Sequence, residues 1–306
     1  MSNDQTLSPG REERLEPTSF EYQRADSWDE AVELLRIWDG EAKIIAGGQS
    51  LVPMMNLRLT RPTALIDINE IGDEGGPRLE DGDTGPVVVI PALTRQSTVL
   101  ASPVVAEHCP MLRRGVGLVG NVRVRNRGSF GGSIAHADPT GEVPCCVLAM
   151  GGTVVLRGPR GTRAVPTTEW FHTYLTTAAE LDELVTEVRI PSAAGTAWAF
   201  QEEVRRYSDF ATVSVAVQVR PDRLPRIVLG GVADRPILLS DDVVDPLRNP
   251  EPETLAAVAE SAARSVHPES DVHASGEHRR RLVRVLVTRA LAEALRPSSA
   301  TRGDLR

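Results

Sequence analysis

Cysteine is scarce in this sequence, whose 306 residues include only Cys109, Cys145 and Cys146. Three cysteines, two of them adjacent, do not make a disulfide framework. A cysteine-ligated iron–sulfur cluster takes about four thiolates, and zinc sites have characteristic Cys and His spacings; neither pattern occurs. We therefore expect buried, reduced thiols and no metal bound by this chain. Any redox cofactor must be held without cysteine ligands.

Long apolar runs and an excess of positive charge are also absent. No stretch approaches the roughly 18–20 apolar residues that span a bilayer, and the polar N-terminus lacks the apolar segment of a secretory signal. The 42 acidic residues outnumber the 34 basic ones, which argues against a nucleic acid as the main ligand. These features predict a cytoplasmic protein without membrane insertion, in which residues 1–15 form a flexible tail.

What is present first is a compact α/β unit before residue 72. Ser27 followed by Glu30 forms a capping box, and the apolar residues after it recur at helical spacing. Gly40 is expected to end that helix. The expected elements are a helix over 28–38, a strand over 43–46, a helix-like stretch over 51–59 and a strand over 64–68.

The remainder of the chain predicts a second, larger unit and a C-terminal domain. Residues 72–86 are rich in Gly and Asp and predict a loop. Residues 94–114 are typical of helix broken at Pro103 and Pro110, and 143–150 form an apolar segment. Alternating or β-branched stretches predict strands over 87–90, 153–156, 184–190, 198–204, 211–219 and 227–232. Two amphipathic helices, over 255–266 and 283–294, flank a polar loop over 267–276.

Two segments share a run of glycines followed by serine: Ala46-Gly47-Gly48-Gln49-Ser50 and Phe130-Gly131-Gly132-Ser133. Glycine has no Cβ, so its backbone can approach a bulky anion and turn through positive φ. Successive amides in such a turn form an anion-binding nest, and serine hydroxyls add donors. Two facing nests could hold one diphosphate without a basic side chain.

The alternative is that each segment is simply a tight turn, because short glycine motifs often match by chance. Two segments, both next to a strand and both ending in serine, leave the two interpretations evenly balanced. Neither is the Gly-x-Gly-x-x-Gly fingerprint of a dinucleotide fold, and neither is a P-loop. NAD and ATP in their usual folds are therefore disfavoured.

The chain resembles the FAD-binding medium subunits of molybdenum hydroxylases, the family of aerobic carbon monoxide dehydrogenase and xanthine dehydrogenase. The resemblance extends from about residue 18 to 296. Four segments in order carry it: AGGQSLVPMM at 46–55, VRNRGSFGGSIAHADP at 124–139, RRYSDFA at 205–211, and His273-Ala274-Ser275 with Arg279, Arg280 and Leu282.

The resemblance implies an α+β fold. It has a two-subdomain α/β FAD-binding domain (16–192, with subdomains 16–72 and 73–192), followed by a C-terminal domain (193–306) in which a small antiparallel sheet packs on helices. FAD would lie between the subdomains. Residues that would contact its diphosphate are Ile45, Ala46, Gly47, Gly48, Gln49, Ser50, Leu51, Ser129, Gly131, Gly132 and Ser133. Asp138 and Glu142 would accept from ribityl or ribose hydroxyls, and Val185 would wall the flavin or adenine pocket.

Some residues depart from the family pattern or have a plainer interpretation. Ser208 stands where relatives often have Gly, Gln201 where the xanthine dehydrogenase branch has Lys, and His278 where many relatives have Tyr. His136 is expected to brace its loop, since no nucleophile or metal partner is near it in the sequence. Asp138 and Glu142 could instead be loop caps. Arg279–Arg281 and Arg284 are expected on the polar side of their helix, where they could dock a partner.

The function that the resemblance implies is electron transfer. A small partner chain with [2Fe–2S] clusters would pass electrons to FAD on this chain. A large partner with the molybdenum cofactor would oxidise the substrate, and an acceptor such as a quinone, NAD or oxygen would reoxidise the flavin. No catalytic side chain is expected. Two alternatives remain: a stand-alone FAD-dependent oxidase, dehydrogenase or monooxygenase, and a flavin-free interaction protein with the same fold.

Overall fold

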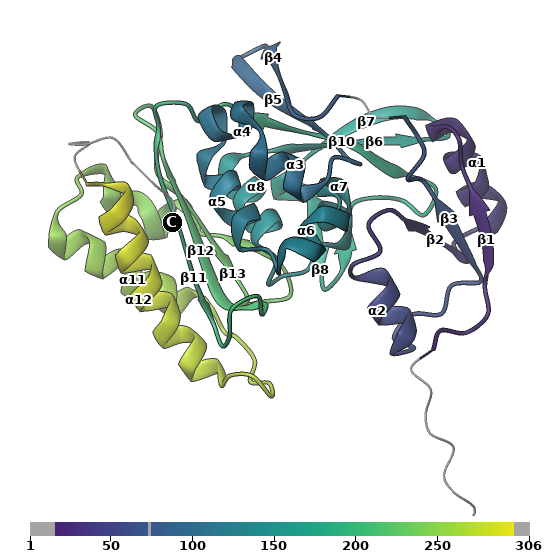
Figure 1. The fold of residues 1–306 in the computed structure, drawn as a ribbon. Coiled ribbons are helices and arrows are strands. Elements are labelled where there is room, and N and C mark those ends of the chain that lie inside the picture. The colour runs from purple at the N-terminus through teal and green to yellow at the C-terminus, as the bar shows by residue number, and fades with distance from the viewer. Residues whose placement is uncertain (1–15, 73–74, 297–306) are drawn as a thin grey trace, which may run out of the picture.

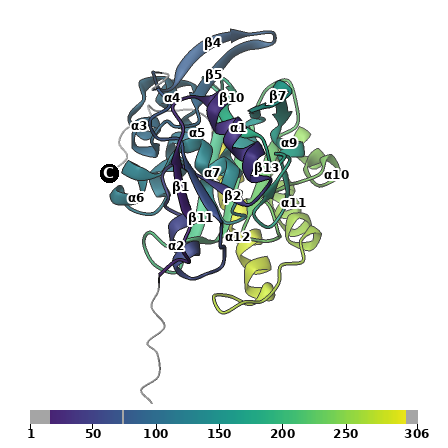
Figure 2. The ribbon, with the colours of Figure 1, turned by 90° about the vertical axis from the view of Figure 1, so that its right-hand side faces the viewer.

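The first unit of the chain is a three-stranded parallel sheet with strand order β1-β3-β2. The computed structural model describes residues 16–72 and 75–296; the tail expected over 1–15 lies outside them. This unit consists of strands β1 (Glu21–Arg24), β2 (Ala42–Ile45) and β3 (Ala64–Asp67) and of helices α1 (Trp28–Trp38) and α2 (Leu51–Asn56). Figure 2 looks onto this unit.

Helix α1 forms where the capping box predicts it. Ser27 accepts a hydrogen bond from the amide of Glu30, and the buried residues Ala31, Val32 and Leu35 place one helical face in the core of this unit. The helix ends at Asp39, which adopts a left-handed φ of 44° one residue before Gly40. The predicted helix over 28–38 is confirmed.

The second unit contains a five-stranded antiparallel sheet with strand order β4-β5-β10-β6-β7. Its strands are β4 (Arg78–Gly82), β5 (Gly85–Pro91), β6 (Thr153–Gly158), β7 (Gly161–Pro166) and β10 (Leu184–Pro191). The expectation of a loop over 72–86 is partly wrong, because β4 and the start of β5 pair there as a hairpin. Asp83 and Thr84 form a two-residue hairpin turn between Gly82 and Gly85 instead of a longer linker.

Helices pack beside this sheet. They are α3 (Gln96–Ala101), α4 (Pro103–His108), α5 (Pro110–Leu118), α6 (Val122–Arg127), α7 (Phe130–His136), α8 (Glu142–Met150) and the short α9 (Thr167–Trp170), which precedes the β8 (Phe171–Thr173) and β9 (Thr176–Thr177) hairpin. Pro103 and Pro110 each stand in the first turn of a new helix, where a missing amide costs no hydrogen bond. Every residue of α8 is buried, which explains why 143–150 is apolar without a helical period.

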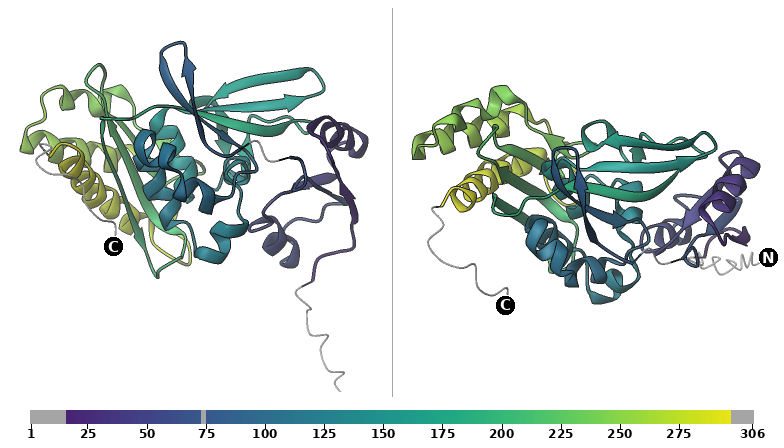
Figure 3. Two further views of the ribbon diagram at one scale, coloured as in Figure 1. Left: turned by 45° about the horizontal axis from the view of Figure 1, so that its top comes forward. Right: turned by 90° about the horizontal axis from the view of Figure 1, so that it is seen from above.

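The C-terminal domain packs a four-stranded antiparallel sheet between helices. Helix α8 covers one face of the sheet, and α11 and α12 cover the other (Figure 1). Figure 3 shows this domain at one end of the molecule and the N-terminal sheet at the opposite end, with the five-stranded sheet between them. The elements are β11 (Ala197–Val204), β12 (Ala211–Val219), β13 (Arg226–Gly230), β14 (Ile237–Leu238), α10 (Asp241–Val244), a 3-10 turn (Asp245–Arg248), α11 (Pro252–Ser265) and α12 (Gly276–Ala294).

Residues of β12 show why this sheet is buried on both faces. Val213, Val215 and Val217 belong to the core under α11 and α12, whereas Ala216 belongs to the core around α8. The sequence of β12 nevertheless alternates, because Thr212, Ser214 and Gln218 are buried polar residues on the face opposite the valines. The α+β architecture expected from the resemblance is confirmed. No helix in the described ranges is long and apolar enough to cross a bilayer.

Candidate FAD site

The first glycine segment lies against the backbone that directly precedes the second. A Cβ built on Gly47 would lie 2.4 Å from the carbonyl oxygen of Arg127 and 2.7 Å from the Cα of Gly128. Only glycine allows so close a backbone approach. The contact joins the end of β2 in the first unit to the stretch just before α7 in the second, the region where α2 faces α6 and α7 in Figure 1. The first glycine segment and the residues just before the second, far apart in sequence, therefore meet at one place.

The first segment is an open turn between β2 and α2. Gly48 has a positive φ of 68°, and the side-chain amide of Gln49 donates to the carbonyl oxygen of Gly47 at 2.9 Å. The carbonyl oxygen of Gly48 accepts from the amide of Val52 at 3.1 Å, which starts the helix. Within the described chain, the backbone amides of Gly47, Gly48, Gln49 and Ser50 donate to no acceptor. Such a run of unsatisfied amides fits an anionic ligand.

The second segment is the start of helix α7 and not an open turn. Ser129 is the N-cap, and its hydroxyl accepts from the amide of Gly132 at 3.3 Å. The amides of Phe130 and Gly131 donate at 2.8 Å to the carbonyl oxygens of Thr94 and Ala92, and that of Ser133 donates to Ser129 at 3.3 Å. These amides already have acceptors, so the expectation of a second amide nest is wrong. The segment pairs with the residues that follow β5, and this pairing uses the amides that a ligand would need.

Gly131 has a packing reason to be glycine. A Cβ at this position would lie 2.4 Å from the Cβ of Ala92, so the helix can approach the strand end only without a side chain. Gly132 is exposed, and the Ser133 hydroxyl accepts from the side-chain amide of Gln96 at 2.7 Å. That hydroxyl keeps its own hydrogen for donation. The groups this segment can offer a ligand are therefore a hydroxyl and the exposed backbone of Gly132.

Two residues that sequence reasoning missed connect the segments. The side-chain amide of Asn69 donates to the carbonyl oxygen of Ala46 at 2.8 Å. Arg95 donates at 2.7 Å to the side-chain oxygen of Asn69 and, with its other terminal nitrogen, at 2.7 Å to the carbonyl oxygen of Arg127. A signal for Asn69 was available, because β2 and β3 are parallel and the residues after them emerge at the same sheet edge. No comparable signal marks Arg95.

Asp138 lies in the loop between α7 and α8 and caps it. One carboxylate oxygen accepts from both the amide and the hydroxyl of Thr140, at 2.8 and 2.6 Å. The other oxygen lies 4.0 Å from the Nε2 of His136, whose pKa burial lowers. The loop-cap interpretation of Asp138 is therefore confirmed, and its second oxygen remains available to a ligand hydroxyl.

Glu142 begins α8 and is buried. Burial, with smaller contributions from the carboxylates of Glu202 and Asp138, raises the pKa of its carboxyl to about 8. One oxygen of Glu202, on β11 of the C-terminal domain, is itself buried without a hydrogen-bond partner in the described residues, and burial raises the pKa of this carboxyl too. Two carboxyl groups from different domains thus share a protein interior that favours their protonated forms.

Val185 lies on β10, the central strand of the five-stranded sheet, and is partly buried against its core. The pairing of β10 with β6 shifts register between Val185 and Glu187. Val185 is among the residues packed against the core cluster that contains Phe130 of the second glycine segment. Its assignment to the pocket wall stays a prediction.

The chain also contains a Gly-x-Gly-x-x-Gly run at Gly115, Gly117 and Gly120. Its first part lies inside helix α5, and a Cβ on Gly115 would lie 2.6 Å from the sulfur of Cys146. A dinucleotide fingerprint joins a strand to the start of a helix, so this run is a helix-packing feature. The resemblance motif and not this run locates the cofactor.

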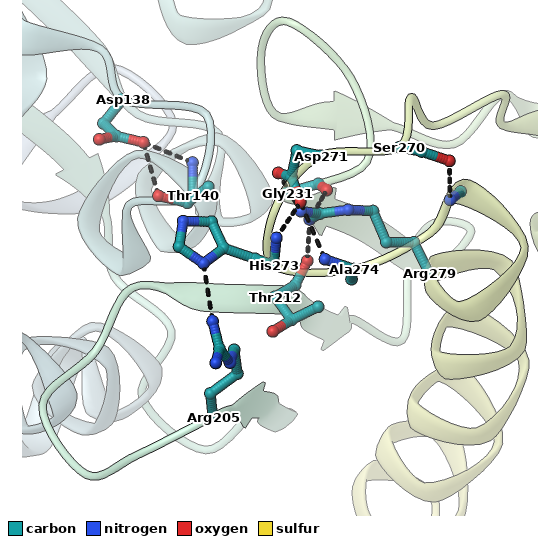
Figure 4. A network of polar contacts seen from close by, with 11 residues as sticks. Asp138, Thr140, Arg205, Thr212, Gly231, Ser270, Asp271, His273, Ala274 and Arg279 are labelled. Atoms are coloured by element: carbon teal, nitrogen blue, oxygen red, sulfur yellow. Dashed lines mark hydrogen bonds and ion pairs between the residues drawn. The ribbon is translucent and has the colours of Figure 1, made fainter.

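The C-terminal segment of the resemblance forms a structural network, drawn in Figure 4. Arg279 donates to the carbonyl oxygens of Thr212 and Gly231 at 2.6 and 2.8 Å and to the carboxylate of Asp271 at 2.6 Å. Asp271 in turn accepts from the amides of His273 and Ala274. The expectation that Arg279 lies on a polar helix face is wrong, because it is 6% exposed. Its neighbours Arg281 and Arg284 are exposed and pair with Glu277 and Glu260.

The comparisons with known proteins identify the family of the chain. A family model described as the FAD binding domain in molybdopterin dehydrogenase matches residues 18–193, and the CO dehydrogenase flavoprotein C-terminal domain matches 198–294. The nicotine 6-hydroxylase medium subunit of Paenarthrobacter nicotinovorans is 36% identical, over 90% of this chain and 97% of its own. The carbon monoxide dehydrogenase medium chain of Hydrogenophaga pseudoflava is 36% identical, over 91% and 98%.

Solved structures give the same result. A carbon monoxide dehydrogenase structure from Hydrogenophaga pseudoflava matches with a TM-score of 0.85 at 36% identity, over 91% of this chain and 98% of that chain. Quinoline 2-oxidoreductase from Pseudomonas putida 86 matches with a TM-score of 0.83 at 30% identity, over 91% and 98%. With both family models and near full-length relatives in agreement, the chain belongs to the FAD-binding medium subunits of molybdenum hydroxylase-type dehydrogenases.

Proposed function

We propose that this chain carries electrons through FAD between a small [2Fe–2S] subunit and a final acceptor, within a complex whose large subunit holds a molybdenum cofactor. Family membership supports the FAD step. The sequence supports the division of labour, since three cysteines are too few for the four ligands of one [2Fe–2S] cluster. Bound FAD supplies the redox chemistry, and the chain binds and orients it.

The observation that carries the FAD site is the contact between Gly47 and the Arg127–Gly128 backbone, next to four amides with no acceptor in the described chain. We assign the diphosphate to these amides, with the hydroxyl of Ser133 as an additional donor. The proposed contact residues are Ile45, Ala46, Gly47, Gly48, Gln49, Ser50, Leu51, Ser129, Gly131, Gly132, Ser133, Asp138, Glu142 and Val185.

Glu142 is suited to hold a hydroxyl group of the cofactor. Because burial raises the pKa of its carboxyl to about 8, Glu142 keeps its proton at neutral pH and can donate as well as accept. The second oxygen of Asp138 offers an acceptor only. The chain thus presents amide donors at one part of the site and carboxyl groups at another, which matches a cofactor with a diphosphate and a polyol.

We also propose the domain limits 16–72, 73–192 and 193–306, and a cytoplasmic location. The gap between the two matched family models, at 193–198, supports the second limit. The three cysteines are free and buried, which is usual for a protein kept in a reducing compartment.

The experiment that tests the function is purification of the chain from its native host, with an absorption spectrum and metal analysis. We expect a heterotrimer that contains flavin, iron and molybdenum. An active yellow monomer or dimer would instead support a stand-alone flavoenzyme acting on a small molecule. A colourless chain that fails to take up added FAD would overturn the assignment.

A further inference from the structure

Arg95 stands between the two glycine segments. It precedes helix α3 and forms an isolated bridge pair with Ser129. One terminal nitrogen of its guanidinium donates to the carbonyl oxygen of Arg127 in the second unit, and the other donates to the side-chain oxygen of Asn69. The side-chain amide of Asn69 in turn donates to the carbonyl oxygen of Ala46 in the first unit. The planar fork of one side chain therefore spans the junction between the two units. A lysine ammonium at this position could not direct two fixed donors in this way.

The charge of Arg95 has no carboxylate partner among the described residues. Asp67 accepts from the amide and side chain of Asn69 at 2.8 and 2.6 Å and from the hydroxyl of Tyr22. Burial and the like charge of Arg127 lower the pKa of Arg95, and the charge of Asp67 only partly offsets them. A half-buried cation that only neutral oxygens contact is costly unless an anion lies near it.

An anion that offset the charge of Arg95 would lie at the same junction between the two units as the unsatisfied amides. The amides of Gly47–Ser50 follow directly after Ala46, whose carbonyl oxygen ends the Arg95–Asn69 chain of hydrogen bonds. Amide donors and the half-buried guanidinium of Arg95 thus lie at one junction, which is the chemistry of a diphosphate site.

We propose that Arg95 is a positioning residue for the diphosphate of FAD: it fixes the two glycine segments relative to each other and supplies positive charge beside them. The proposal rests on the proposed function and corrects the expectation that two turns could hold the diphosphate without a basic side chain. The proposal gives Arg95 two contributions, the positioning of the segments and the positive charge, and different substitutions remove them. Arg95→Gln removes the charge and most of the fork, whereas Arg95→Lys keeps the charge and loses the fork.

A second substitution tests the charge without touching Arg95. Asn69→Asp keeps an oxygen for Arg95 and places a negative charge beside it, and it also loses the amide that donates to Ala46, so both the field at the diphosphate and the support of the first glycine segment weaken. The matched control is Arg226→Gln. Arg226 is also a half-buried arginine that donates to two carbonyl oxygens, those of Ala149 and Leu148, and burial lowers its pKa too. It lies at the opposite end of α8 from Glu142.

The experiment removes the flavin from the full-length chain and then measures the dissociation constant of added FAD. Quenching of flavin fluorescence reports binding, at low and at high salt. The thermal midpoint of unfolding of the flavin-free chain is measured as well. Charge-assisted hydrogen bonds of this kind correspond to about tenfold to a hundredfold in affinity. We expect Arg95→Gln and Asn69→Asp to weaken FAD binding by that factor and to flatten its dependence on salt. Arg95→Lys should weaken binding and keep the salt dependence, and Arg226→Gln should change affinity by less than about twofold.

The proposal is overturned if Arg95→Gln binds FAD within about twofold of the affinity of the unsubstituted chain. If Arg95→Gln does not fold, the same result for both Arg95→Lys and Asn69→Asp overturns it. An equal loss of affinity in Arg226→Gln would also overturn it, because the effect would then be general destabilisation. If the unsubstituted chain itself takes up no FAD, the proposed function fails and not this inference.

Discussion

The α-carbon of Gly47 lies so close to Arg127 that an alanine Cβ at position 47 would be 2.4 Å from the Arg127 carbonyl oxygen. Backbone atoms on the opposing side cannot rotate away as a flexible side chain can. Arg95 fixes that same carbonyl oxygen through a hydrogen bond of 2.7 Å. The distance between the two units at the cofactor site is therefore set by a residue that has no side chain.

Gly47→Ala should separate the two glycine segments and weaken FAD binding by at least about tenfold, since a small misplacement at a preorganised site is costly. Titration of the flavin-free variant with FAD measures the effect. Gly117→Ala is the control, because Gly117 lies in helix α5 and a Cβ there would lie 3.5 Å from the side chain of Leu100 in α3, an ordinary contact. Unchanged affinity in Gly47→Ala would show that the two segments do not act together.

The pH dependence of stability should reflect Glu142. Its carboxyl has an ordinary pKa of 4.5 when exposed and about 8 when buried in the folded chain. The folded chain therefore keeps a proton that the unfolded chain releases, so the stabilisation is fully present below pH 4.5 and is lost as pH rises through 8. Urea unfolding of the flavin-free chain between pH 5 and pH 9 should show a loss on the order of a few kcal/mol.

Glu142→Gln should remove much of that dependence, because an amide stays neutral over the whole range. Glu202 lies near and its raised pKa contributes in the same direction, so the double variant with Glu202→Gln should show the flattest profile. Equal slopes for the unsubstituted chain and Glu142→Gln would contradict the assignment of the slope to this carboxyl.

Arg279→Ala should destabilise the C-terminal domain by about 2–4 kcal/mol. The change removes the Arg279 donor from the buried carbonyl oxygen of Thr212 and the partly buried one of Gly231, and unsatisfied buried groups cost free energy. Chemical denaturation measures the loss. Arg281→Ala on the same helix removes an exposed pair with Glu277 and should have little effect, since exposed ion pairs contribute little. Similar losses in both variants would mean that the buried contacts are not the cause.

The thiols should be unreactive in the folded chain. Burial raises the pKa of Cys109 and Cys145 to about 12 and raises that of Cys146 as well, and the thiolate is the reactive form. A disulfide reagent at pH 8 should therefore modify none of them until denaturant is added, when all three should react. Rapid modification of one thiol under native conditions would locate an opening that the structure does not have.

The sequence predicted most elements because their local signals agreed with their packing. The Ser27 capping box and the breaks at Pro103 and Pro110 marked helix starts correctly. The hairpin containing β4 was missed because its residues are polar and exposed, so no apolar alternation marks the strand. Arg279 was misassigned because its three-dimensional partners lie 48 and 67 residues away, and no helical period shows them.

The position of the candidate site could be predicted from the sequence, but the hydrogen-bonding groups available there could not. Glycine runs located both segments, since close backbone approach needs glycine wherever it occurs. The sequence could not show that the amides of 130–133 already pair with Thr94, Ala92 and Ser129, because those acceptors come from the tertiary fold. For the same reason Asn69 and Arg95 were missed, as their roles depend on neighbours from two units.

The strand order β4-β5-β10-β6-β7 places β10, the last strand of its sheet in sequence, at the centre. On the ribosome, the hairpins β4–β5 and β6–β7 emerge before the strand that joins them. Such non-local closure is slow and leaves strand edges open to wrong partners. Newly made chains should therefore depend on chaperones until residue 191 has emerged, and only then can the flavin be loaded.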